Sequence, residues 1–502
     1  MNNSPPVSTD TIGSRIRSGV AWKAGSQLTL QISRMVVALV LARLLAPEDW
    51  GLAAMAVAFS GFVVVFTDNA LGTALIQRRE VLQQDCATVF WISVGAGALL
   101  ALLGVALSQP LAHFYGEPEV AALFAALSAG FFVSSLGTTH MALLLREMQF
   151  RKLELRQIAV TIVGSVIGIG IAVAGYGAWA IVGQLLAETI TSTLLLWVLT
   201  PWRPSAGFSI ASIRRLGTFA GNVFGENVVY QAGRSLSGVL VGRLLGASPL
   251  GVYTLATNVI LVPFARLAAP LQQVFFPAFS RMSHDRGRIA DVWIRATRLV
   301  GFFSIPALVG LAIVAPEFVD VVLGPSWGEA IPVIRILAVV GILLSLQTLS
   351  TEVMQALGKV ATLLRITLLW ATASLAAIAI GTHWGIVGVA ACYTAVTVVI
   401  EPLRAYVTTR ALHISIWRFA GALVGIVQAT AIMAAAVLAV REALIAAGTP
   451  AAVRLVVAVV FGGGVYLAAC LWRAPEITAE FKRISSHRRR ARAEGDVLDA
   501  RL

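Results

Sequence analysis

Charge is what this chain has least of. Only 13% of its 502 residues are Asp, Glu, Lys or Arg, whereas 58% are hydrophobic. A soluble chain of ordinary composition carries about a quarter of charged residues to cover its surface. The composition therefore excludes a soluble globular protein and indicates that lipid surrounds most of the chain.

Cysteine is also scarce. Cys86, Cys392 and Cys470 fall in or at the ends of separate apolar segments, with neither a pairing pattern nor metal-ligand spacing. The six histidines form no spaced pair, and no Gly-rich phosphate loop ending in Lys-Ser/Thr is present. We therefore predict no metal site, no cofactor and no nucleotide hydrolysis. The first apolar stretch carries Lys23 and Arg34 and has no cleavage site after it, so we expect it to remain as a helix rather than to act as a leader.

What the chain has in abundance is long apolar segments. Most are about 20 residues or more, the length that crosses a bilayer as a helix. Two of them, 157–175 and 299–315, are near the lower limit. The sequence therefore predicts an all-α polytopic membrane protein with about fourteen spans: 19–43, 51–76, 86–108, 119–143, 157–175, 178–199, 216–242, 250–280, 299–315, 330–355, 361–381, 384–403, 416–440 and 451–472.

The basic residues alternate between the two sides of these segments. If the N-terminus is cytoplasmic, 30 of the 38 Lys and Arg residues fall on the inside and four in outside loops, Arg43, Arg243, Arg441 and Arg454. Positive loops resist translocation, so we predict a cell-membrane protein with both termini cytoplasmic. The net charge of +13 then reflects topology and contact with membrane lipids rather than binding of nucleic acid.

The chain also contains an internal repeat. An offset of 200 residues aligns residues 14–56 with 214–256, with nine identities that include Arg43-Leu44-Leu45 with Arg243-Leu244-Leu245 and Gly51 with Gly251. Six spans separate the copies, so both halves enter the membrane in the same direction, as in parallel transporter repeats. The expected regions are a polar tail (1–13), an N-lobe (14–204), a C-lobe (205–410), two extra helices (411–473) and a basic cytoplasmic tail (474–502).

Polar side chains lie inside several of the predicted spans. Gln31 and Arg34 share one face of the first span, and the seventh repeats them as Gln231 and Arg234. Because a charged residue at the bilayer centre costs about 3 kcal/mol, these side chains should face protein or a water-filled cavity. One interpretation is a cationic cavity for a phosphate-bearing substrate, lined by Arg34, Arg234, Arg266, Gln31, Gln231 and Arg335.

The other interpretation is that these arginines form structural ion pairs with intramembrane carboxylates, and Arg335 could instead extend outward to the membrane surface. The same carboxylates are candidates for ion coupling: Asp68, Glu188 and Glu226.

Several motifs resemble, in the same order, those of Wzx-type O-antigen and exopolysaccharide flippases of the MOP superfamily. They are Ala-Arg-Leu-Leu-Ala-Pro-Glu-Asp-Trp-Gly (42–51), residues 68–77, Phe-Tyr-Gly (114–116), Gln-Phe-Arg (149–151), Gly-Tyr-Gly-Ala-Trp (175–179) and Trp-Arg-Pro (202–204). The superfamily also contains MATE drug exporters and the lipid II flippase. The resemblance covers about residues 14–410.

This resemblance implies two six-helix lobes that form a V and open alternately to each side. The implied cargo is a sugar oligomer on undecaprenyl pyrophosphate, flipped from the inner to the outer leaflet for surface polysaccharide, including lipopolysaccharide. The implied pyrophosphate site is a cationic cavity, which Arg34, Arg234 and Arg266 would suit. A polymerase and export machinery are the implied partners.

Three other functions are known for membrane proteins with many spans. A MATE-like multidrug antiporter needs an acidic, aromatic cavity for cationic drugs, whereas the intramembrane excess here is basic. Polysaccharide polymerases and ligases typically carry a large outer loop. The longest predicted outer loop here is about fifteen residues. A structural scaffold would not need intramembrane charges. We therefore predict a transporter and not an enzyme.

Overall fold

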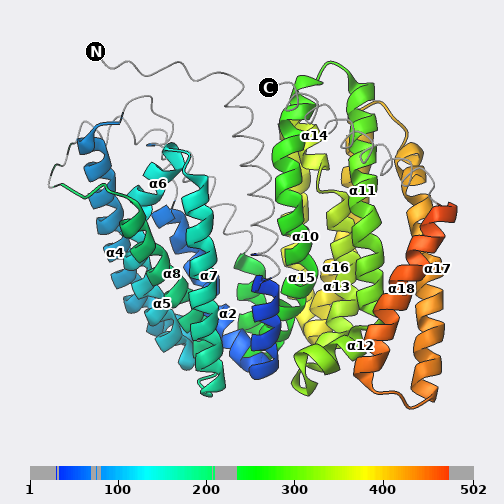
Figure 1. Ribbon diagram of the computed structural model, residues 1–502, viewed down its shortest axis with the longest axis horizontal. Helices are drawn as coiled ribbons and strands as arrows, with labels where there is room; N and C mark the ends of the chain where they lie inside the picture. Colours follow the sequence, from blue (N-terminus) through cyan, green and yellow to red (C-terminus); the bar gives the residue numbers. More distant parts are fainter. Residues whose placement is uncertain are drawn as a thin grey trace, which may run out of the picture. The chain divides into compact units, whose positions relative to one another are not determined.

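The computed structural model (Figure 1) describes residues 33–68, 81–205 and 235–473, together with 30, 75, 207 and 209. The side chains of 59–68, 262–271, 273 and 274 lie outside the description. Over the described residues every regular element is a helix, which confirms the all-α prediction.

The first half of the chain contains two helical stretches without a label, 33–44 and Ser235–Leu245. Its labelled helices are α2 (Pro47–Asp68), α4 (Gln83–Tyr115), α5 (Glu119–Ser135), α6 (Thr138–Arg146), α7 (Phe150–Val173) and α8 (Trp179–Leu199).

The second half contains α10 (Ala247–Arg281), α11 (Arg286–Ile313), α12 (Ala315–Phe318), η1 (Val319–Leu323), η2 (Pro325–Trp327), α13 (Ala330–Leu346), α14 (Ser350–Ala356), α15 (Val360–Gly381), η3 (Thr382–Trp384), α16 (Gly385–Ala411), α17 (Ile416–Ala446) and α18 (Ala451–Arg473).

Eight helical segments in the described part of the chain are long and apolar enough to cross a membrane, and the bent pair α5–α6 makes nine. One of the eight, Val360–Ala411, contains both α15 and α16. Its 52 residues are more than twice what one crossing needs. Each of the fourteen predicted segments is largely helical where it is described, with short interruptions such as 136–137 and 347–349, and the exact number of crossings stays a prediction.

Two predicted segments are longer in the structure than in the sequence analysis. The segment predicted at 157–175 begins at Phe150, and the one at 299–315 begins at Arg286. Their first turns carry arginines and carboxylates, which an apolar pattern does not detect. Both helices are therefore full-length spans of 24 and 28 residues.

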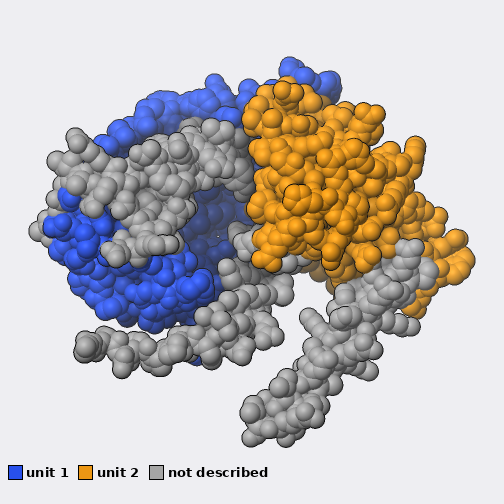
Figure 2. All heavy atoms as spheres, turned by 90° about the horizontal axis from the view of Figure 1, so that it is seen from above, with its two compact units in different colours: residues 1–255, 378–389 blue, residues 256–377, 390–502 orange. Residues whose placement is uncertain are grey.

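The chain divides into two compact units, coloured in Figure 2. Unit 1 comprises residues 1–255 and 378–389, and unit 2 comprises residues 256–377 and 390–502. The predicted division into lobes, extra helices and tails rests on the repeat and the charges, and it stays a prediction.

Small residues bring the helices of unit 1 together. A Cβ atom at Gly97 of α4 would overlap the Ser135 hydroxyl group of α5, and one at Gly104 would overlap the Ser128 hydroxyl group. In lipid no hydrophobic effect drives helices together, because the lipid tails are as apolar as the side chains. Close packing at small residues contributes to helix association instead.

Unit 2 has a continuous apolar core that includes α17 and α18. Trp293 of α11, which is fully buried, stacks on Phe419 of α17 with ring centroids 4.6 Å apart. Tyr466 of α18 donates its hydroxyl proton to the Phe302 carbonyl oxygen at 2.8 Å. The two C-terminal helices, which have no counterpart in the repeat, are therefore packed on α11 as part of this unit.

Candidate functional site

The two copies of the repeat meet in unit 1 at the starts of α2 and α10. A Cβ atom at Gly51 would overlap the Ala247 carbonyl group, and one at Gly251 would overlap the Pro47 carbonyl group. Pro47 and Ala247 are themselves equivalent positions in the repeat. The contact is therefore reciprocal, and it explains physically why glycine stands at both equivalent positions.

Two more of the sequence motifs have structural roles in unit 1. Asp49 accepts a hydrogen bond from the Ala46 amide at 2.9 Å, and its carboxylate lies against Gly177 in the turn between α7 and α8. Trp202 donates to Gln83 Oε1 at 2.7 Å and so attaches the segment after α8 to the start of α4. These residues fix connections between helices.

Helix α6 of unit 1 carries a buried histidine. His140 of α6 is fully buried and stacks on Trp197 of α8, with centroids 4.8 Å apart. Phe90 and Trp202 contact it edge-on. The sequence showed no partner for this histidine, because its neighbours come from three separate segments.

Arg34 and Glu188 are the predicted site residues that the structure brings near each other. Arg34 lies in the helical stretch 33–44 and is half-buried. Its positive charge acts on the carboxylate of Glu188, which is half-buried in α8. The structure records no ion pair within 4 Å for Arg34, so a direct structural pair is not formed in the described residues.

The surroundings of Glu188 are polar and closely packed. Gln184, one turn earlier on α8, donates to Glu188 Oε1 at 3.2 Å. Gly164 and Gly168 of α7 leave room for these two side chains, and a Cβ at Gly168 would lie 2.9 Å from the Gln184 Cβ. The helices of unit 1 therefore hold an amide beside a carboxylate, and an arginine whose charge acts on that carboxylate. Charged side chains inside a membrane cost free energy, and those that are kept there usually have a function.

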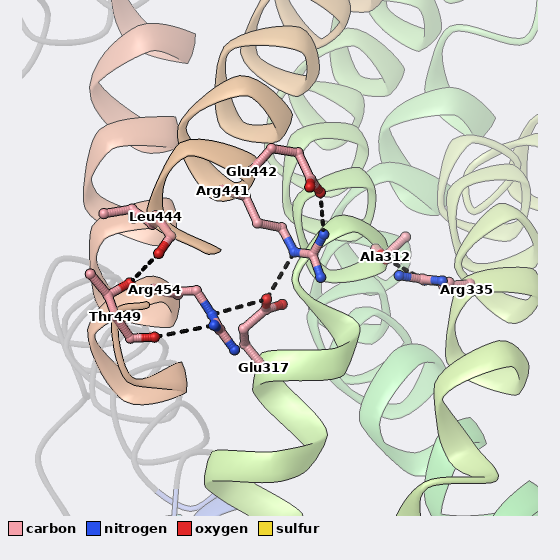
Figure 3. Close-up of polar contacts among 8 residues, drawn as sticks. All are labelled: Ala312, Glu317, Arg335, Arg441, Glu442, Leu444, Thr449 and Arg454. Carbon is pink, nitrogen blue, oxygen red and sulfur yellow. Dashed lines mark hydrogen bonds and ion pairs between the residues drawn. The ribbon is translucent and has the colours of Figure 1, made fainter. Parts of the chain in front are cut away.

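Arg335 has a different environment. It is exposed, and its Nε donates to the Ala312 carbonyl oxygen at 3.2 Å, at the last turn of α11 (Figure 3). A cation at this position satisfies an open carbonyl and interacts favourably with the negative end of the helix dipole. Its assignment to the substrate cavity stays a prediction.

The other predicted site residues lie outside the described residues. For two of them, Arg266 in α10 and Asp68 at the end of α2, the helix is described and the side chain is not. The rest are Gln31, Gln231, Arg234 and Glu226.

Unit 2 contains a charged cluster that includes Arg441 and Arg454, two of the arginines predicted to lie in outside loops. Glu317 of α12 has only 2% of its side chain exposed, and Arg441 Nε donates to its Oε1 at 2.9 Å (Figure 3). Arg454 Nε lies 3.5 Å from the same oxygen, and Arg454 also donates to the Thr449 carbonyl. We call Glu317, Arg441 and Arg454 the Glu317 cluster.

Two further buried carboxylates lie in unit 2. Glu401 of α16 is fully buried, and its Oε1 lies 3.5 Å from Arg404, one turn later. Glu352 of α14 is 6% exposed, and its Oε2 has no hydrogen-bond partner. In the described part of the chain no three metal-ligating side chains come together.

Comparison with known proteins agrees with this architecture. The chain is 28% identical to the lipopolysaccharide biosynthesis protein WzxC of Escherichia coli, over 65% of this chain and 67% of that protein. It is 27% identical to the succinoglycan biosynthesis transport protein ExoT of Rhizobium meliloti, over 66% of this chain and 67% of that one.

Its fold is similar to that of the lipid II flippase MurJ in an inward closed conformation. The TM-score is 0.69 at 15% identity, over 90% of this chain and 99% of that one. Residues 40–332, more than half of the sequence, match the polysaccharide biosynthesis protein family. The chain is therefore a multi-pass membrane protein of the polysaccharide biosynthesis protein family.

Proposed function

We propose that this protein is a flippase that moves an undecaprenyl-pyrophosphate-linked oligosaccharide from the inner to the outer leaflet of the cell membrane. The observation that carries the proposal is membership of a polysaccharide biosynthesis family in a chain with the fold of a lipid flippase. The relative ExoT is named as a transport protein, which supports movement of the cargo rather than its synthesis.

The polar group in unit 1 supports an anionic cargo. Arg34 is half-buried and is held by no ion pair among the described residues, so its guanidinium keeps donors for a ligand. Guanidinium presents a planar fork of N–H donors that suits phosphate oxygens. In the proposed mechanism Arg34 binds the pyrophosphate, together with Arg234 and Arg266.

The reciprocal contact between Gly51 and Gly251 suits alternating access. On the predicted topology it lies at the outer side of the membrane, because the loops that carry Arg43 and Arg243 are outside. The proposed cycle separates this contact to release the cargo outward and remakes it to accept the next one. Both termini are cytoplasmic in this scheme, and a polymerase acts on the product outside.

Substitution of Arg34 tests the proposal. In a complemented deletion strain, Arg34→Ala should abolish surface polysaccharide while the amount of folded protein in the membrane is retained. Arg34→Lys should restore export in part, because it supplies a point charge without the fork of donors. Arg288→Ala, which removes an exposed arginine on α11, is the matched control and should export normally.

Two outcomes would count against the proposal. Normal export by Arg34→Ala would remove this residue from the cargo site. Loss of the protein in step with loss of export would assign Arg34 to structural pairing with Glu188 instead.

A further inference from the structure

The span formed by α13 and α14 is broken inside unit 2. Helix α13 ends at Leu346 and α14 begins at Ser350, and we call residues 347–349 the α13–α14 break. Irregular backbone at membrane depth is tolerated only where protein or water satisfies its polar groups. The interruption lies within one candidate span, Ala330–Ala356, and in many transporters ions and substrates bind at discontinuous helices.

Most polar groups at the break are satisfied by neighbouring side chains. Ser350 donates to Gln347 Oε1 at 2.7 Å, and both residues are buried. Gln272 of α10 donates its amide to the Thr348 carbonyl oxygen at 3.2 Å. Just before the break, Ser345 donates to Ser304 Oγ of α11 at 2.8 Å.

Glu352, in the first turn of α14, is the exception. Its side chain is buried, its Oε2 accepts no hydrogen bond, and no Lys, Arg or His among the described residues lies within ion-pair distance of it. Gln272 is the polar side chain that acts on this carboxylate. An ionised carboxylate without a cation in such a place is unfavourable by several kcal/mol, so the group must take up a positive charge.

The charged residues on the helices packed around α14 leave Glu352 without a counterion. Glu401 pairs with Arg404, and Arg418 pairs with Asp291 at 2.8 Å. Among the described residues none of the other cations on these helices forms an ion pair with Glu352: Arg281, Arg286, Arg288, Arg295, Arg298, Arg335, Lys359, Arg365 and Arg410. The side chain of Arg266 on α10 lies outside the description.

The ligand that fits is a proton rather than a metal cation. A hard cation takes several oxygen ligands, whereas Glu352 is the single carboxylate at the break. Among the described residues, no group of three His, Cys, Asp or Glu side chains that could hold a metal ion is found. A proton needs one oxygen only, and Glu352 Oε2 is free to hold it.

We propose that Glu352 is a proton-binding site at the α13–α14 break, where one proton binds to the carboxylate and leaves again in each transport cycle. The proposal rests on the proposed function, because the proton would drive the cargo step. Gln272 connects the site to α10, the helix that also carries Arg266, so ionisation of Glu352 would act on a helix proposed to hold the pyrophosphate.

Infrared titration of the purified full-length protein tests proton binding without any cargo. The wild type should show a band of a protonated carboxyl group that disappears as the pH is raised, and Glu352→Gln should lack that component. Glu401→Gln is the matched control, because it removes a buried carboxylate that has an arginine beside it. It should leave the component in place. Identical titrations of the wild type and Glu352→Gln would overturn the proposal.

Export by the same variants tests the coupling. Glu352→Gln, which cannot release a proton, should reduce surface polysaccharide to the level of the deletion strain while the protein still accumulates. Glu352→Asp should retain part of the export. Normal export by Glu352→Gln would overturn the coupling role. A deletion strain with unchanged polysaccharide would instead refute the proposed function, and the infrared result would still decide whether Glu352 binds a proton.

Discussion

Unit 2 buries two carboxylates on either side of α13, and their environments differ. Glu317, before α13, has two arginines at one of its oxygens. Glu352, after α13, has no cation within ion-pair distance in the part of the chain that the structure describes. Both side chains are more than nine-tenths buried. Burial alone therefore does not distinguish a structural carboxylate from one that titrates, and the partners do.

The difference between Glu317 and Glu352 lies in whether cationic side chains are present beside the carboxylate. The arginines beside Glu317 offset its negative charge and connect α12 to α17 and α18, so the pairs contribute to the association of helices. Removing one partner of such a pair leaves an uncompensated buried charge. Glu352 has no such partner, so a neutral residue of the same shape should fit its place.

The largest effect should come from breaking the shorter pair of the Glu317 cluster. Arg441→Ala leaves Glu317 without its 2.9 Å partner and should destabilise the protein by about 3–5 kcal/mol. Thermal unfolding of the purified protein in detergent measures this loss. Glu442→Gln, at a carboxylate that also contacts Arg441 but is 65% exposed, should change little. Equal stability of Arg441→Ala and the wild type would show that the Glu317 cluster does not stabilise the folded protein.

The second effect should be smaller because the second pair is longer and more exposed. Arg454 Nε lies 3.5 Å from Glu317, and its side chain is 23% exposed. We expect Arg454→Ala to cost about 1–3 kcal/mol, measured in the same unfolding assay. An effect larger than that of Arg441→Ala would reverse the order of the two partners.

The smallest effect should come from Glu352→Gln. If the carboxyl group is already neutral in the folded protein, the amide replaces it with little change in charge or volume. The unfolding temperature should then stay within the range of about 1 kcal/mol that conservative changes produce. A loss comparable to that of Arg441→Ala would show that Glu352 makes a stabilising ion pair of the kind that Glu317 makes, and the contrast between them would fail.

Much of the fold is predictable from the sequence because lipid imposes a length and a composition on each span. The apolar segments are largely helical, and Gly51 and Gly251, which the repeat aligns, lie against Ala247 and Pro47. The first turns of α7 and α11 were missed because their polar residues interrupt the apolar pattern. The α13–α14 break was missed for another reason: Gln347-Thr348-Leu349-Ser350 contains neither glycine nor proline.

The candidate site was predictable only where neighbours are close in sequence or share a helix face. Arg34 could be identified as an unusual charge in an apolar span, but its proximity to Glu188 depends on how α8 packs. The Glu317 cluster joins residues more than 120 positions apart, and in the sequence its members look like ordinary loop charges. Whether a cation lies near Glu352 likewise depends on how the surrounding helices pack, which the sequence alone does not show.

The most direct test of the central claim is a flipping assay with purified protein in liposomes. Undecaprenyl pyrophosphate carrying the strain's own oligosaccharide is placed in one leaflet, and its arrival in the other is followed with a lectin that does not cross the membrane. The account predicts transfer with the wild type and none with Arg34→Ala. Transfer by the wild type no faster than in protein-free liposomes, with a pH gradient in either direction, would contradict it.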